Sequence, residues 1–319
     1  MSELPVSFTD IAAAARRIAG HVHWTPVLTS RRLDERFGCR LSFKCENLQR
    51  IGAFKARGAH NAVLALRPEA AAQGVVTHSS GNHAAALSLA AGTRGIPAFI
   101  VMPENAPAAK IDSVRRLGGR ISFCAPTIAA REAAAAAIVA ARGATLIHPY
   151  DDPLVIAGQG TAALELIEQA GPLDAILAPV GGGGLMGGSA VAARHLLPGV
   201  RVLATEPAQA DDAYQSWRAG ERLVGSAPDT IADGLRTTLG VNGFVLLRAL
   251  LDDFATVSEA AIVEAMRLVW EVLKIVIEPS AAVPVAALIE GRFDLSGARV
   301  GIILSGGNVD LDRLPWQAG

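Results

Sequence analysis

The chain has 319 residues, of which 51% are hydrophobic and 18% are charged, so it can build a large hydrophobic core and is not an intrinsically disordered protein. Its 29 lysine and arginine residues almost balance its 30 aspartate and glutamate residues, and only 5% of its residues are aromatic. This composition argues against a protein that coats nucleic acid and against a polybasic membrane-binding surface.

Features that report on the cellular compartment predict a soluble cytoplasmic protein. The longest uncharged runs are interrupted by polar residues, glycine and proline, which is not typical of membrane helices. Residues 1–10 have neither the basic nor the apolar region of a signal peptide. Cys39, Cys45 and Cys124 make an odd count without a C-x-x-C spacing, so we expect neither a disulfide framework nor a structural zinc site.

Short apolar runs alternate along the chain with longer runs rich in alanine and leucine at helical spacing. The expected strands cover residues 74–77, 98–102, 120–123, 145–147, 175–180, 200–205 and 299–304. The expected helices cover residues 9–18, 56–65, 82–91, 107–117, 128–141, 156–170, 185–196, 259–273 and 280–289. This alternation predicts an α/β fold with mostly parallel sheets covered on both faces.

The pattern also predicts two domains. Residues 67–149 contain a compact run of alternating strands and helices, and we expect them to form a small domain inserted into a larger one made of residues 1–66 and 150–319. The cleft between two such domains is the default place for a ligand site.

A first candidate site surrounds Lys55, which follows Phe54 at an expected helix start among small residues. Apolar neighbours and the positive end of a helix lower the pKa of a lysine, so that more of it is a neutral amine. A neutral amine can form a Schiff base with an aldehyde cofactor. The alternative is an ordinary surface lysine.

A second candidate site is the polar turn that lies between an expected strand and the helix at 82–91. Its residues are Ser79, Ser80, Gly81, Asn82 and His83. Free backbone N–H groups at a helix N-terminus suit a carboxylate, and the serine and asparagine side chains add further donors. The alternative is a plain helix cap made by Ser80 or Asn82.

A third candidate site is the glycine run that follows the expected strand at 175–180. Gly181, Gly182, Gly183 and Gly184 allow the backbone to wrap around a phosphate at a helix start. A rival interpretation is a dinucleotide fingerprint of an NAD-dependent oxidoreductase. In that interpretation Gly182, Gly184 and Gly187 form G-x-G-x-x-G, and Glu206 follows about 20 residues later.

Two shorter segments complete the candidates. Ser305 follows the expected strand at 299–304, where a hydroxyl points into the ligand crevice of a parallel sheet, although a simple turn would also explain its two following glycines. Glu206, the carbonyl of Ala210, and Asp212 could hold Mg²⁺ or Ca²⁺ together with water; the alternative is a solvated acidic loop.

Taken together and in this order, these segments resemble the fold-type II pyridoxal-phosphate (PLP) enzymes, the class of the tryptophan synthase β subunit. The similarity is strongest to the serine/threonine dehydratase and serine racemase branch, and it runs from about residue 9 to residue 314. The resemblance implies two open, mostly parallel-sheet domains with the cofactor in the cleft between them.

The resemblance also implies roles for individual residues. Lys55 would bind the cofactor covalently beside Phe54, Asn82 would contact the pyridine 3-oxygen, and Ser305 would face the ring nitrogen. The 181–184 loop would hold the cofactor phosphate, and the carbonyl of Gly234 would lie near the cofactor. Residues 79–83 would hold the substrate carboxylate, and Ser80 would be a second acid/base.

In the racemase-like branch, Glu206, Ala210 and Asp212 bind a divalent cation, which would be Mg²⁺, Ca²⁺ or Mn²⁺. The resemblance further implies a homodimer that acts on a small amino acid. A non-catalytic paralogue would be expected to lose Lys55 or Ser305, and both are present.

The expected activity is that of an ammonia-lyase, which dehydrates 3-hydroxyaspartate, serine or threonine to a 2-oxo acid and ammonia; the alternative within the family is a serine racemase. Arg131 matches an arginine that reaches a second acidic group in the racemase-like branch, and a guanidinium pairs well with a carboxylate. A surface arginine on an alanine-rich helix is the other interpretation. Tyr150 stands where animal serine racemases have asparagine, which favours a dehydratase.

Overall fold

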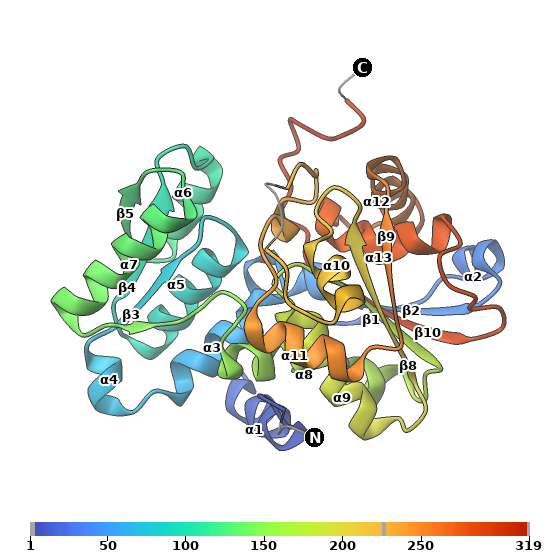
Figure 1. Cartoon of the computed structure of the whole chain (residues 1–319), viewed down its shortest axis with the longest axis horizontal. Helices are drawn as coiled ribbons and strands as arrows, with labels where there is room; N and C mark the ends of the chain where they lie inside the picture. Colours follow the sequence, from blue (N-terminus) through green and yellow to red (C-terminus); the bar gives the residue numbers. More distant parts are fainter. Residues whose placement is uncertain (1–3, 225–227, 318–319) are drawn as a thin grey trace.

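The strands of the computed structural model, which describes residues 4–224 and 228–317, form two sheets (Figure 1). Within those residues the larger sheet has six strands in the order β1-β2-β10-β7-β8-β9, and the smaller sheet has four in the order β5-β4-β3-β6. Every neighbouring pair is parallel except β1 and β2. The predicted α/β class with two mostly parallel sheets is confirmed.

The strands are short and the helices cover both faces of the sheets. The strands are β1 (Val27–Leu28), β2 (Arg40–Cys45), β3 (Val75–His78), β4 (Ala98–Pro103), β5 (Arg120–Cys124), β6 (Thr145–Leu146), β7 (Ala175–Pro179), β8 (Arg201–Pro207), β9 (Asp253–Val257) and β10 (Arg299–Leu304). The helices are α1 (Phe8–Ile18), α2 (Arg31–Phe37), α3 (Lys55–Ala65), α4 (Pro68–Ala72), α5 (Asn82–Arg94), α6 (Ala108–Arg116), α7 (Ile128–Arg142), α8 (Pro153–Ala170), α9 (Gly184–Leu196), α10 (Asp212–Ala219), α11 (Val241–Leu250), α12 (Glu259–Leu273) and α13 (Pro279–Ile289), with short 3₁₀ turns η1 (Glu46–Leu48), η2 (Arg50–Gly52) and η3 (Asp233–Leu235).

All expected strands and helices are present, with differences only at their ends. The sequence interpretation missed β1, β2, β9, α2, α4, α10 and α11. In β2 the buried Lys44 interrupts the apolar pattern that marks a buried strand. No helix among the described residues is long and apolar enough to cross a membrane.

The larger sheet is buried on both faces because successive side chains of a strand point to opposite sides. In β10, Val300, Ile302 and Leu304 join the core beneath α12 and α13, whereas Ile303 joins the core beneath α1, α8, α9 and α11. Apolar residues on both faces explain why these central strands form continuous apolar runs.

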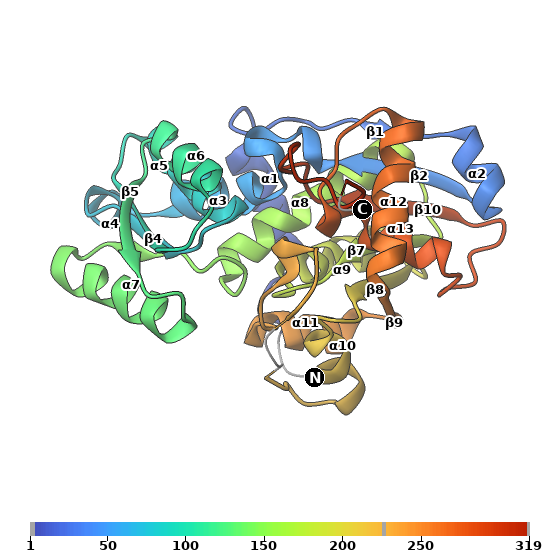
Figure 2. The same cartoon turned by 90° about the horizontal axis from the view of Figure 1, so that it is seen from above.

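The smaller sheet and its helices form the lobe on the left of Figures 1 and 2. One of its faces packs against α3 and α5, and the other packs against α7. Since α3 also packs against α8 and α1, it lies where the two lobes meet. The boundaries 67 and 149 of the inserted domain stay a prediction, and residues 1–3, 225–227 and 318–319, which fall in the predicted larger domain, lie outside the described residues.

Candidate active site

A cavity of about 490 Å³ lies between the two lobes, at the carboxyl ends of β3, β7 and β10. This is where open α/β sheets bind their ligands, and the volume is in the range of small-molecule sites. The structure brings to this cavity every residue that the sequence predicted for the cofactor and the substrate, namely Phe54, Lys55, Ser79, Ser80, Gly81, Asn82, His83, Arg131, Gly181, Gly182, Gly183, Gly184, Gly234 and Ser305.

Lys55 is the first residue of α3, as predicted, and its amine faces an enclosed environment. Its Nζ donates a hydrogen bond to the carbonyl oxygen of Pro149 at 2.8 Å, and it lies 5.1 Å from the ring centroid of Phe54. Burial lowers the pKa of Lys55 to about 8, against the opposing attraction of the Glu278 carboxylate. The interpretation of Lys55 as an ordinary surface lysine is therefore wrong.

The segment that leads to Lys55 is fixed against the segment that follows β10. The Phe54 N–H donates to the carbonyl oxygen of Ser305 at 3.0 Å, and the Gly307 N–H donates to that of Gly52 at 2.9 Å. Ile51 has a φ of 60°, an unusual conformation for a β-branched residue. The chain thus holds Lys55 next to Ser305, although the two lie at opposite ends of the sequence.

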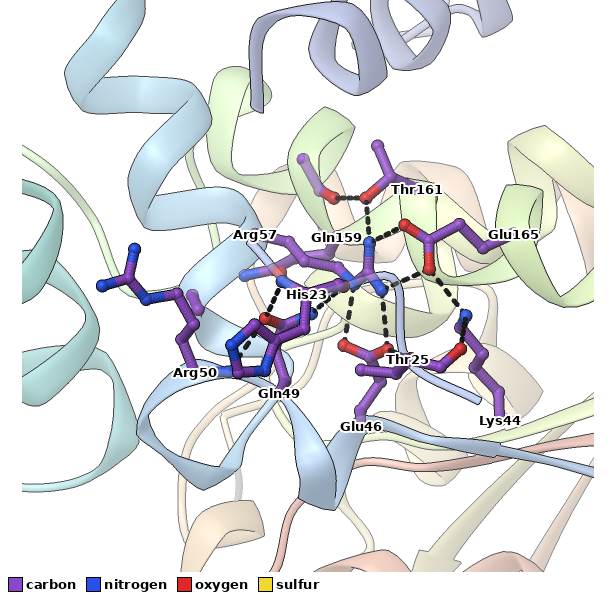
Figure 3. A network of polar contacts seen from close by, with 12 residues as sticks. His23, Thr25, Lys44, Glu46, Gln49, Arg50, Arg57, Gln159, Thr161 and Glu165 are labelled. Atoms are coloured by element: carbon purple, nitrogen blue, oxygen red, sulfur yellow. Dashed lines mark hydrogen bonds and ion pairs between the residues drawn. The ribbon is translucent and has the colours of Figure 1, made fainter. Parts of the chain in front are cut away.

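A buried network of charges surrounds Arg57 in the first turn of α3 (Figure 3). Arg57 donates to both carboxylate oxygens of Glu46 and of Glu165, and Lys44 donates to Glu165 at 2.6 Å. Burial alone would raise the pKa of Glu46, but Arg57, Thr25 and Lys44 together hold that pKa below its ordinary value. Because the four charges are paired, the network can lie in the interior and fix the backbone two residues after Lys55.

The turn before α5 presents free backbone donors to the cavity. The N-cap of α5 is Gly81, and no side chain caps the helix, so the alternative of a cap by Ser80 or Asn82 is wrong. An ideal Cβ on Gly81 would meet no atom within 4 Å, which leaves this backbone open to the cavity. An uncapped helix N-terminus that faces a cavity suits an anionic group such as a carboxylate.

The glycine loop is packed tightly on its protein side. An ideal Cβ on Gly182 would lie 2.2 Å from ring carbons of Tyr150, and one on Gly184 would lie 2.8 Å from the Tyr150 carbonyl oxygen. Gly183, with a φ of 88°, is the N-cap of α9 and has no side-chain cap. Glycines therefore let the loop approach Tyr150 closely while the free amides at the start of α9 remain for an anion.

The sequence interpretation missed several residues of the cavity. Glu278, which precedes α13, is almost fully buried, and burial together with the repulsion of Asp233 raises its pKa to about 7. His148 stacks edge-on between His78 and Tyr150, and burial lowers its pKa to about 4. Glu278 is the lone acidic residue of the apolar run 275–278, and this was a signal in the sequence. No signal in the sequence marked His148.

The predicted cation ligands lie away from this cavity, at the end of β8. Glu206 is fully buried; its Oε2 accepts from the Tyr214 N–H at 2.9 Å, while its Oε1 has no partner. Burial and the repulsion of Asp212 raise the pKa of Glu206 well above its ordinary value. A second carboxylate beside an unpartnered buried oxygen fits a divalent cation, although the described residues hold no cluster of three or more His, Cys, Asp or Glu that could bind a metal.

Comparisons with known proteins identify the family. The family model for "Pyridoxal-phosphate dependent enzyme" matches residues 18–306. The chain belongs to the pyridoxal-phosphate-dependent enzymes. It is a fold-type II member, of the family that includes serine racemases and the threonine and hydroxyaspartate dehydratases. The rival interpretation as an NAD-dependent oxidoreductase is therefore wrong. The structure agrees, because Glu206, the acidic residue of that interpretation, does not line the cavity.

The relatives divide between dehydratases and racemases. The chain is 51% identical over 311 residues to a β-hydroxyaspartate dehydratase of Paracoccus denitrificans, covering 98% of this chain and 99% of the relative. It is 50% identical over 314 residues to a serine racemase of Arabidopsis thaliana, covering 97% and 95%. Among solved structures, maize serine racemase matches with a TM-score of 0.95 and 46% identity, covering 98% of this chain and 97% of that one.

Proposed function

We propose that this protein is a dehydratase that removes water from a small 3-hydroxy amino acid, with 3-hydroxyaspartate preferred over serine and threonine. The products are a 2-oxo acid and ammonia. The observation that carries this proposal is the position of Arg131 in the same cavity as Lys55. The 51% identity to a β-hydroxyaspartate dehydratase supports it.

The residues of the cavity fit PLP. We assign the covalent link to Lys55, the phosphate to the amides of the 181–184 loop, and the ring nitrogen to the hydroxyl of Ser305. Asn82, Phe54 and Gly234 line the same cavity, so Asn82 would donate to the 3-oxygen, and Phe54 and the carbonyl of Gly234 would lie beside the cofactor. When bound, PLP supplies an electron sink for negative charge at the substrate Cα.

The protein's own residues move the protons. Once it is released from its link with the cofactor, the Lys55 amine would take the proton from the substrate Cα, and its lowered pKa leaves more of the free amine in the neutral form that can do so. The free amides at the start of α5, with Ser79, Gly81 and His83, hold the substrate carboxylate. The Cβ hydroxyl group would take up a proton and leave as water, with the proton removed from Cα balancing the one it takes up. The resulting enamine would tautomerise to an imine, which takes up one water and releases the 2-oxo acid and ammonia.

Arg131 determines the preference for an acidic substrate. It begins the second turn of α7, is half-buried and lines the cavity, which supports a role beyond that of a surface arginine. Among the described residues its side chain makes one hydrogen bond, a long one of 3.4 Å from Nε to the Thr127 carbonyl oxygen, and it has no carboxylate within 4.0 Å. A half-buried guanidinium in a cavity suits the second carboxylate of hydroxyaspartate, which serine and threonine lack.

A substrate comparison tests this assignment. Release of 2-oxo acid is measured with serine, threonine and each hydroxyaspartate isomer, for the wild type, Arg131→Ala and the control Arg115→Ala, an exposed arginine of α6. We expect Arg131→Ala to lower kcat/KM for hydroxyaspartate ~10- to 100-fold, the worth of one charge-assisted pair, with little change for serine. Equal losses on both substrates would refute it.

Serine racemase is the second candidate, because Ser80 lines the cavity with Lys55 and a relative named serine racemase is 50% identical. Racemisation needs a second acid/base that returns a proton to the other face of Cα, and Ser80 fills this role. Chiral chromatography of serine incubated with the enzyme distinguishes the two activities. Conversion between serine enantiomers faster than 2-oxo acid release would favour the racemase.

Further assignments belong to the same proposal. Glu206, the carbonyl of Ala210, and Asp212 hold a divalent cation, most simply Mg²⁺ or Ca²⁺. A homodimer and a cytoplasmic location stay predictions, which gel filtration and cell fractionation test.

A further inference from the structure

The side-chain amide of Asn308 has an orientation that its partners determine. Its Nδ2 lies 2.7 Å from the carbonyl oxygen of Ile51 and 2.9 Å from Oδ1 of Asn82. A backbone carbonyl only accepts, so the Asn308 NH₂ group must face Ile51. Its second N–H then requires an acceptor on Asn82, which places the Asn82 oxygen, and not its nitrogen, toward Asn308.

Glu278 determines the other end of the Asn82 amide. Asn82 Nδ2 lies 3.1 Å from Oε1 and 3.3 Å from Oε2 of Glu278, and the Asn308 N–H donates to Oε2 at 3.1 Å. Both contacts join one nitrogen to one carboxylate, so a single N–H of Asn82 can make them as a bifurcated hydrogen bond. The second N–H of Nδ2 is then left for another acceptor. An ideal Cβ at Gly306 would lie 2.7 Å from Glu278 Oε1, so a glycine there makes room for the carboxylate.

We propose that Glu278 and Asn308 are positioning residues, which fix the side-chain amide of Asn82 so that its remaining N–H faces the 3-oxygen of the cofactor. This inference rests on the assignment of Asn82 in the proposed function. Without these partners the amide could turn over and present its oxygen, which would repel the cofactor oxygen instead of donating to it.

The substitution Glu278→Gln tests the inference with little change in shape. A glutamine side chain has one accepting oxygen and one NH₂ group. The NH₂ group would face either the Asn82 NH₂ or the Asn308 N–H, so one of these hydrogen bonds would be replaced by a repulsive contact between two donors. Asn308→Asp is a second variant, because a carboxylate can donate neither to Ile51 nor to Asn82. Glu264→Gln, an exposed glutamate of α12, is the control.

Two readouts besides activity follow the cofactor directly. The ultraviolet–visible spectrum of the holoenzyme reports whether the 3-oxygen is ionised or protonated, and titration of the cofactor-free protein with PLP gives its Kd. We expect Glu278→Gln and Asn308→Asp to shift the spectrum toward the protonated 3-oxygen and to weaken PLP binding by about tenfold, the worth of one hydrogen bond. Glu264→Gln should match the wild type, and thermal unfolding of the cofactor-free variants checks that they fold.

The background Asn82→Ala separates the possible outcomes. If Glu278 acts through Asn82, then Glu278→Gln adds no spectral shift once Asn82 is alanine. A shift that persists in that background means that Glu278 acts directly on the cofactor, and a wild-type spectrum in both positioning variants means that neither fixes Asn82; either result overturns the inference. If Asn82→Ala itself leaves the spectrum unchanged, the assignment of Asn82 in the proposed function fails as well.

Discussion

Lys55 and Glu278 line the same cavity, and their pKa values are shifted toward each other. Burial lowers the pKa of Lys55 to about 8 and raises that of Glu278 to about 7. Groups whose environments oppose their charged forms are typical of functional sites. The Glu278 carboxylate opposes the effect of burial on the pKa of Lys55, whereas the repulsion of Asp233 adds to the effect of burial on the pKa of Glu278.

The raised pKa of Glu278 predicts how the stability of the cofactor-free protein depends on pH. Between its ordinary pKa of 4.5 and about 7, the folded protein holds a proton that the unfolded chain has lost. The free energy of unfolding therefore falls as the pH rises through this window, by about 3 kcal/mol from this group. Urea unfolding at several pH values should show this fall, and Glu278→Gln should remove it. An unchanged slope in Glu278→Gln, relative to the exposed control Glu264→Gln, would contradict the assignment.

The buried charge network predicts a large cost for Arg57→Met. This change leaves Glu46 and Glu165 without their buried partner, and breaking such a pair costs about 3–5 kcal/mol. The matched control is Arg36→Met, which breaks an exposed pair with Glu264 and should cost at most about 1 kcal/mol. Chemical denaturation measures both variants, and equal losses would mean that the network contributes no more than a surface pair.

Gly182→Ala should be harmful because the new methyl group meets the ring of Tyr150 at 2.2 Å. Overpacking of this kind costs about 1–3 kcal/mol, and displacement of the loop should also weaken PLP binding. Gly92→Ala in α5 is the control, since its nearest contact is at 3.9 Å and alanine favours a helix. Thermal unfolding and PLP titration measure both; a Gly182→Ala protein with wild-type affinity for PLP would show that the loop does not hold the phosphate.

The cation assignment predicts that Mg²⁺ or Ca²⁺ stabilises the protein. A bound cation would neutralise the Glu206 and Asp212 carboxylates, so the melting temperature should rise with added cation and fall after treatment with a chelator. Glu206→Gln should abolish this response, whereas Glu271→Gln on the exposed face of α12 should retain it. A wild-type protein indifferent to both cation and chelator would rule the site out.

The sequence predicted those parts of the site whose interacting residues are close together in the chain, and it missed the parts whose partners are far apart in the chain. The 79–83 turn and the 181–184 loop each lie at a strand-to-helix junction, and such a junction leaves a local signal of glycine, serine and asparagine. Lys55 begins a helix after two 3₁₀ turns, and small residues around it mark that helix start. The partners of buried polar residues leave no such local signal, because these partners are remote in the sequence. Lys44 pairs with Glu165, 121 positions away, and Glu278 meets Asn82, 196 positions away. The strand β2 was missed for the same reason, since its lysine looks like a surface residue until its partner is known.

The covalent link at Lys55 is the most direct test of the whole interpretation. The lysines of the chain are Lys44, Lys55, Lys110 and Lys274. Lys44 is buried against Glu165, and Lys110 is bound to Asp233 in an exposed pair. Reduction of the holoenzyme with borohydride, followed by peptide mapping, should find the pyridoxyl group on Lys55, and Lys55→Ala should be colourless and inactive. A pyridoxyl group on another lysine, or a Lys55→Ala protein that still eliminates water, would contradict it.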